Sequence, residues 1–331
     1  MPKQLLLLFV LTLSVFSCSK EDTPDLPGEI AVPTVQQDET YTVNVITDII
    51  YGEGLSHTTL NGPDFTSNSL LLDAYVPDNN LTNRPAVLLI HGGGFINGSR
   101  KDGNIVRFAE YFASRGFVAF SISYRLSGNL GTVPQAWVDY GLANVPVDSR
   151  AQFNAIYPAN RDAKAALRWL HANVDTYRIN PDYITVGGGS AGANTSINLG
   201  VTDPTDYTNE LTLQQDPTLI STNLEQPIAV HTILDLWGSG SSVVAIDEVF
   251  GFNRFDATDA PVIIIHGTND FTVDFSLAEE LRDTYISNGV PYEFYPLQGA
   301  GHSAWSSTIN GESLESVCFD FVVDQQKLTV E

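Results

Sequence analysis

The stretch YITVGGGSAGANTS, residues 183–196, fits two motifs that imply different chemistry. The G-x-G-x-x-G turn, which seats the pyrophosphate of a dinucleotide, is satisfied by Gly187, Gly189 and Gly192. The G-x-S-x-G turn, which presents a nucleophilic serine, is satisfied by Gly188, Ser190 and Gly192. Both turns join a strand to a helix, so the rest of the chain has to decide between them.

The surroundings of the stretch argue against a dinucleotide site. That fingerprint belongs in the first strand–helix–strand unit and needs an acidic residue about 20 positions later, at the end of the next strand. Here the motif lies in the middle of the chain, and the following acids, Asp203 and Asp206, lie in a polar segment. The Lys-Ser/Thr pair of a P-loop is also absent from the sequence. These features favour the serine interpretation.

Apolar runs that alternate with helical patterns predict the fold class. Strand-like runs occupy residues 41–51, 70–76, 86–90, 117–123, 183–187, 228–236, 261–267 and 292–297. Helical spacing occupies residues 105–116, 160–174, 190–200, 274–289 and the run from 313 onward. The alternation predicts an α/β fold with a mostly parallel, doubly wound sheet and helices on both faces. Residues 127–157 and 200–227 are long for connections and are predicted to form small lid or rim insertions.

The composition favours one large globular domain. The chain has 331 residues, of which 43% are hydrophobic, and its formal net charge of -23 argues against nucleic acid as a partner. It has two cysteines, Cys18 and Cys318, and no Cys or His cluster with metal-ligand spacing, so we expect no metal site.

The N-terminal residues predict export. Lys3 precedes a short apolar run that ends in small residues, which is typical of a secretory signal over residues 1–17. The following Cys18 resembles the lipid-modified cysteine of bacterial lipoproteins. Residues 18–38 are polar and acidic, so they are predicted to be a flexible tether, with the catalytic domain over residues 39–331. We expect an exported protein whose only membrane contact is a lipid anchor in the bacterial outer membrane, facing the periplasm or the exterior.

A nucleophilic serine needs a base within hydrogen-bonding reach, an acid that orients the base, and donors for the oxyanion. Two candidates follow Ser190 at the ends of predicted strands: Asp270 in IIIHGTNDFTVDF and His302 in YPLQGAGHSAW. The order serine, acid, histidine is the one required when the serine sits on a strand–turn–helix elbow. Asp235 is a rival acid at the end of the preceding strand, but the HG-x-x-D context favours Asp270. Upstream, HGGG at residues 91–94 follows another buried run.

These motifs, in this order, resemble α/β-hydrolase fold serine esterases of the HGGG class, which include carboxylesterases, hormone-sensitive-lipase-like enzymes and bacterial feruloyl and acetyl-xylan esterases. The resemblance extends from about residue 65 to the C-terminus. It implies that Ser190 is the nucleophile, His302 the general base and Asp270 the acid of a catalytic triad. It also implies an oxyanion hole built from the backbone N–H groups of Gly93, Gly94 and Ala191. No cofactor or metal is implied.

The sequence departs from the two best-known branches of that class. Gly189 stands where those branches have Asp or Glu before the serine, and Ser127-Gly128 replaces Ala-Pro-Glu after the Tyr-Arg-Leu of residues 124–126. We therefore expect a polysaccharide-linked or small-molecule ester as substrate, with a short acyl or a feruloyl group. The aromatic residues predicted to contact it are Phe95, Trp237 and Trp305, with packing at the rim or core as the alternative.

Two other functions fit the same residues. An amidase or peptidase of this fold would use the same triad. A hydrolase-like surface protein that only binds its ligand is the third interpretation, although a complete set of serine, base and acid argues against it.

Overall fold

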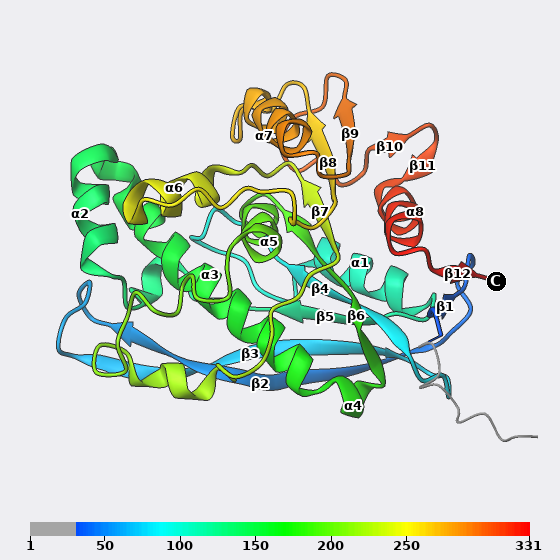
Figure 1. The fold of residues 1–331 in the computed structure, drawn as a ribbon, viewed down its shortest axis with the longest axis horizontal. Coiled ribbons are helices and arrows are strands. Elements are labelled where there is room, and N and C mark those ends of the chain that lie inside the picture. The colour runs from blue at the N-terminus through cyan, green and yellow to red at the C-terminus, as the bar shows by residue number, and fades with distance from the viewer. Residues whose placement is uncertain (1–30) are drawn as a thin grey trace, which may run out of the picture. The chain divides into compact units, whose positions relative to one another are not determined.

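An eight-stranded sheet runs through the part of the chain that the computed structural model describes, residues 31–331 (Figure 1). In sheet order its strands are β2 (Val43–His57), β3 (Phe65–Pro77), β5 (Val118–Ile122), β4 (Arg84–Ile90), β6 (Ile179–Gly189), β7 (Thr232–Leu236), β8 (Val262–Gly267) and β9 (Tyr292–Leu297). The last six strands in this order, β5, β4, β6, β7, β8 and β9, are parallel to one another. Strand β3 pairs antiparallel with β5, and β2 pairs antiparallel with β3 at the edge of the sheet. This is the mostly parallel, doubly wound sheet that the sequence predicted.

Helices cover both faces of this sheet. One face packs against α3 (Arg150–Ala172), α5 (Ala191–Val201), α6 (Ser241–Phe250) and α7 (Phe275–Asn288). The other face packs against α1 (Gly103–Ala113) and α8 (Leu314–Gln326). Successive residues of β4 alternate between the faces: Leu88 and Ile90 point to the first, and Val87 and Leu89 to the second. Burial on both sides explains why the strand reads as a continuous apolar run.

The two segments predicted as insertions lie beside the first face and contain more helix than the sequence indicated. Residues 127–157 contain η1 (Ser127–Asn129), α2 (Gln135–Asn144), η2 (Val147–Ser149) and the start of α3. The helical spacing placed the start of that helix at residue 160, whereas α3 begins at Arg150 and runs through Pro158. Helix α6 was not predicted. Residues 200–227 contain only η3 (Pro217–Ser221) beyond the end of α5.

The boundary predicted at residue 39 is too late. Strand β1 (Thr34–Val35) pairs in parallel with β12 (Thr329–Val330), and Val35 is fully buried. Burial of that side chain and pairing with the C-terminal strand attach the end of the predicted tether to the domain. The predicted signal sequence, Cys18 and the first part of the tether lie outside the described residues. Within residues 31–331, no helix has the length and apolar character needed to cross a membrane.

Buried ion pairs attach the insertions to the sheet. Arg125, which follows β5, donates through Nη2 to Asp162 Oδ1 at 2.6 Å and through Nε to Asp162 Oδ2 at 2.9 Å. Its Nη1 donates to the carbonyl of Leu55 in β2 at 3.0 Å. Arg161, the neighbour of Asp162 on α3, donates to Asp216 beside η3 at 2.8 Å. Each side chain is at most 4% exposed, so each charge depends on its partner for stabilisation.

We predict that Asp162→Ala destabilises the protein by about 3–5 kcal/mol, because it leaves the Arg125 guanidinium buried without its partner. Urea-induced unfolding followed by circular dichroism measures the loss. The control Asp175→Ala removes an exposed carboxylate and should change stability by less than about 0.5 kcal/mol. Equal effects of the two changes would contradict a structural role for the buried pair.

Candidate active site

Ser190 occupies the sharp turn between β6 and α5, with φ 57° and ψ −121°. A side chain on Gly188 or Gly192 would bring its Cβ within 2.2 or 2.0 Å of the carbonyl oxygen of Ile90, so both positions require glycine. The backbone N–H of Ser190 donates to the carbonyl of Leu236 at 2.9 Å. The neighbouring strands thus hold the serine in a conformation that a free chain would avoid.

Three side chains from separate loops meet at this turn. His302 Nδ1 lies 2.7 Å from Asp270 Oδ2, and His302 Nε2 lies 2.9 Å from Ser190 Oγ. Because a carboxylate only accepts, Nδ1 carries the proton and Nε2 is free to accept one from the serine hydroxyl. The structure therefore brings together the three residues that the sequence singled out.

Asp270 is held from several directions. Its Oδ1 accepts the backbone N–H groups of Thr272 at 2.8 Å and Val273 at 3.0 Å. Burial raises the pKa of this carboxyl, but the hydrogen bonds from His302, Thr272 and Val273 outweigh it and hold the pKa below its ordinary value. His266 Nε2 donates to the carbonyl of Val273 at 2.9 Å, which braces the same loop.

The rival acid, Asp235, does not contact the histidine. It lies at the end of β7, fully buried, with Oδ1 accepting the N–H of Gly238 at 2.8 Å. Its Oδ2 has no hydrogen-bond partner within residues 31–331. Burial raises the pKa of Asp235 to about 7. A carboxyl in this setting organises the turn that follows β7.

The HGGG loop follows β4 and faces the serine. Gly93 and Gly94 have φ of 101° and 61°, and a Cβ on Gly93 would lie 2.1 Å from the carbonyl oxygen of Asn97. The His91 ring stacks on Tyr124 at 4.2 Å and donates to the carbonyl of Gly92 at 2.7 Å, which braces the loop.

The N–H groups of Gly93, Gly94 and Ala191 donate to no acceptor in the described part of the chain. Ala191 is the first residue of α5, where unpaired N–H groups favour negative charge.

A cavity of about 290 Å³ surrounds Ser190 and His302 and is lined in part by Trp237 and Trp305. The two indole rings meet edge to face, with centroids 4.7 Å apart. They lie so close to Gly189 that a Cβ there would be 2.7 Å from Trp305 Cζ2 and 3.1 Å from Trp237 Nε1. This contact explains why glycine replaces the acidic residue expected before the serine.

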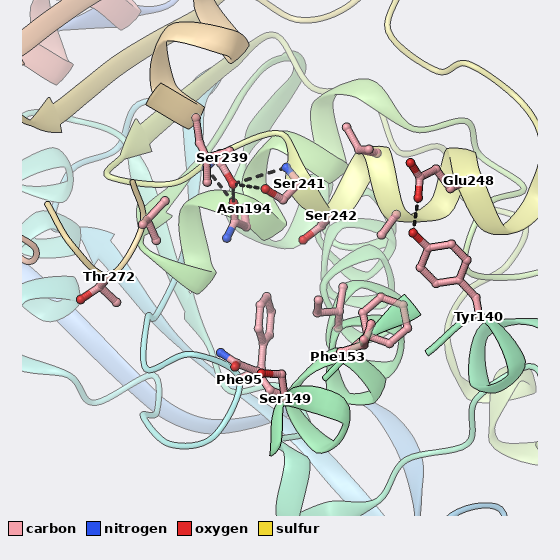
Figure 2. A pocket seen from close by; sticks show the side chains of 17 residues that line it. Phe95, Tyr140, Ser149, Phe153, Asn194, Ser239, Ser241, Ser242, Glu248 and Thr272 are labelled. Carbon is pink, nitrogen blue, oxygen red and sulfur yellow. Dashed lines mark hydrogen bonds between the residues drawn. The ribbon is translucent and has the colours of Figure 1, made fainter. Parts of the chain in front are cut away.

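A second cavity, of about 390 Å³, lies between α2, the start of α3 and α6 (Figure 2). Phe95, the third aromatic residue predicted to contact substrate, lines this second cavity. Thr272, two residues after Asp270, lines both cavities, so the two cavities lie next to each other there. No sequence pattern identified the polar residues of the second cavity, since they come from α2, η2, α3, α5, α6 and two loops.

The arrangement suits nucleophilic chemistry at a carbonyl carbon. An imidazole in contact with a hydroxyl can take its proton, and an ionised carboxylate behind the ring stabilises the imidazolium that forms. Among residues 31–331, no group of three or more His, Cys, Asp or Glu side chains is placed to hold a metal ion.

The family model BD-FAE matches residues 72–136 and 129–249, which together are more than half of the chain. Phenmedipham hydrolase of Pseudarthrobacter oxydans is 34% identical over 137 residues, which are 41% of this chain. The chain spans about a quarter of that relative's length, 24%.

Solved structures share the fold. The propionate-bound esterase Est2 of Thermogutta terrifontis is 20% identical with a TM-score of 0.57, over 82% of this chain and 94% of that one. A truncated carbohydrate esterase from gut microbiota is 19% identical with a TM-score of 0.58, over 90% of this chain and 100% of that one. At these identities the likeness supports the fold alone.

We predict that Gly189→Ala destabilises the protein by about 1–3 kcal/mol, because the new methyl group overlaps the Trp305 ring. Trp305→Phe should relieve the overlap, so the double variant should lose at least about 0.5 kcal/mol less than the sum of the single losses. Urea denaturation of all four proteins measures this coupling. Gly103→Ala is the matched control, since nothing lies within 4 Å of a Cβ there. Strict additivity would contradict the contact.

We predict that Asp235→Asn stabilises the protein at pH 8 and not at pH 4. The folded pKa, about 7, lies above the ordinary value of 3.8, so the folded state binds the proton more tightly. The stability that this group contributes is therefore present below pH 4 and is lost as pH rises through 7. Because asparagine carries no charge, Asp235→Asn should raise the free energy of unfolding at pH 8 by on the order of 2–4 kcal/mol.

The Asp235→Asn comparison is made by urea denaturation across pH, with Asp175→Asn as an exposed control. A pH-independent difference between Asp235→Asn and the parent would show that ionisation of Asp235 is not the cause.

Proposed function

The chain belongs to the BD-FAE family, and from this premise we propose that it is a serine carboxylic-ester hydrolase acting through Ser190, His302 and Asp270. The observation that carries the proposal is the continuous hydrogen-bonded chain of these residues, at 2.9 Å from serine to histidine and 2.7 Å from histidine to aspartate. Among residues 31–331, no other hydroxyl that lines the catalytic cavity is hydrogen-bonded to a histidine.

In the first half-reaction, His302 Nε2 takes the proton of Ser190 Oγ while the oxygen attacks the ester carbonyl carbon. Asp270 stays ionised, because its hydrogen bonds keep its pKa low, and it stabilises the imidazolium. The two N–H groups that hold its Oδ1 prevent the carboxylate from turning away from the ring.

Negative charge then develops on the former carbonyl oxygen. We assign its stabilisation to the N–H groups of Gly93 and Gly94, which border the same cavity as Ser190, and to that of Ala191, the next residue after the serine; all three are free to donate. The rigid HGGG loop, braced by the stacked rings of His91 and Tyr124, keeps two of these donors in place without rearrangement.

His302 next gives its proton to the leaving alcohol, and the C–O bond of the ester breaks. Water attacks the acyl-enzyme with the same roles, so the acid is released and Ser190 regains its proton. Every proton in this cycle moves between substrate, water and the chain's own side chains.

The proposed substrate is a short-acyl or feruloyl ester of a carbohydrate. The name of one structural relative, a carbohydrate esterase, supports this class. The aromatic wall of Trp237 and Trp305 beside Ser190 supports it too, because indole rings bind sugar and aromatic rings. We propose further that the protein is exported and anchored by lipid at Cys18, as its first residues indicate.

We predict that Ser190→Ala lowers kcat by ~10³-fold or more, because no other group supplies the nucleophile. Release of p-nitrophenol from p-nitrophenyl acetate measures the loss, and the exposed change Ser287→Ala is the control. Full turnover by Ser190→Ala would overturn the triad.

Acetylated xylan, methyl ferulate and an aminoacyl anilide then test the substrate class. Cleavage of the anilide alone would show an amidase or peptidase instead.

A further inference from the structure

The second cavity has a polar wall beside the active site. Asn194, on α5, lies one helical turn after the nucleophile, and its backbone N–H donates to the carbonyl of Ser190 at 3.0 Å. The Asn194 side chain lines the second cavity together with Thr272, which also borders the catalytic cavity. A group bound against this wall therefore lies directly beside a substrate attached to Ser190.

The orientation of the Asn194 amide is determined by its partners. Its Oδ1 accepts the backbone N–H of Ser239 at 2.7 Å and the hydroxyl of Ser239 at 2.9 Å. A backbone N–H can only donate, so the atom facing it is the oxygen. Ser239 is itself held by the hydroxyl of Ser241 at 2.8 Å.

The amide nitrogen therefore points the other way. In Figure 2, Nδ2 of Asn194 faces away from Ser239 and into the cavity. It donates to no acceptor within residues 31–331. The result is a rigid, unused hydrogen-bond donor on the cavity wall.

The rest of the cavity is mainly apolar. Side chains of Phe95, Phe153, Ile156, Val244, Ala245 and Leu277 form most of its surface. At the end away from Thr272, Tyr140 donates to Glu248 across the opening between α2 and α6 (Figure 2). These walls disfavour a group that carries hydroxyls all round, since most of those hydroxyls would lose water without gaining a partner.

We propose that this cavity is a subsite for a largely apolar substrate group that carries one oxygen atom, an ether, methoxy or hydroxyl oxygen, to which Asn194 Nδ2 donates. The inference rests on the proposed esterase function and names a binding residue for it. Asn194 discriminates substrates because an apolar group at the same position leaves the donor desolvated and unpaired.

The position of the histidine indicates which part of the ester occupies the subsite. His302 gives its proton to the leaving alcohol, and it lines the catalytic cavity but not the second cavity. The alcohol therefore leaves on the side of the catalytic cavity, and the acyl group extends into the subsite.

Two pairs of matched esters test the subsite on both sides of the scissile bond. For the acyl side, p-nitrophenyl methoxyacetate and p-nitrophenyl butyrate differ by one ether oxygen in place of a methylene. For the alcohol side, 2-methoxyethyl acetate and butyl acetate differ in the same way. The readout is the ratio of kcat/KM for the oxygen-containing ester to that for its partner, which cancels effects common to both esters.

Two variants separate the donor from the charge. Asn194→Asp keeps the oxygen that Ser239 needs and replaces the donor with an acceptor, whereas Asn194→Ala removes the donor without adding charge. The acyl-side ratio should fall about three- to tenfold in both variants, the range for one lost hydrogen bond. Asn288→Asp, at the end of α7, makes the same chemical change away from both cavities and should leave the ratio at its parental value.

A fall in the alcohol-side ratio instead would support the subsite and show that it holds the alcohol. Unchanged ratios in both pairs would overturn the proposal, as would a fall in Asn194→Asp alone, which would reflect charge. Wild-type protein that cleaves none of the four esters would instead count against the esterase function. The experiment therefore separates failure of the subsite from failure of the function.

Discussion

The site depends on one constraint, the contact between the Ile90 carbonyl at the end of β4 and the turn that carries Ser190. The contact is close enough that neither Gly188 nor Gly192 can carry a side chain. The same turn holds Ser190, a non-glycine residue, at positive φ, which costs about 1–3 kcal/mol. The parallel pairing of β6 with β4 and β7 on either side offsets that cost. The hydroxyl is thereby raised above the carboxyl edge of the sheet.

The fixed serine determines where the other groups have to be. Asp270 follows β8 and His302 follows β9, and the parallel order of these strands brings both loops to the same edge as Ser190. Each loop has its own restraints: two N–H groups hold the aspartate, and the Trp305 ring packs on Gly189 after the histidine. The hydrogen bonds of the site therefore form between groups that are already positioned.

The sequence predicted the parts of this design that follow from local pattern. Strands buried on both faces, such as β4 and β8, appear as apolar runs, and motif order identified Ser190, Asp270 and His302. It did not predict α6 or the early start of α3, because packing of the insertions outweighs local signals such as Pro158. Nor could it predict Asn194 as a donor, since that depends on Ser239, 45 residues away, reaching its amide oxygen.

Two basic side chains, Arg254 and Lys164, connect the walls of the second cavity to the segment after α5. Arg254 pairs with both Asp206 and Asp247, and so attaches α6 to the segment after α5. Lys164 on α3 is buried and donates to the carbonyls of Asp203 and Asp206, with its pKa lowered to about 7 by burial. Both cavity walls, α3 and α6, are thus attached to the same loop by directional hydrogen bonds and ion pairs whose loss would leave buried charges unpaired. Walls tied to one loop, and an amide whose orientation is fixed by its own hydrogen bonds, lower the ordering cost that a ligand bound between them would incur.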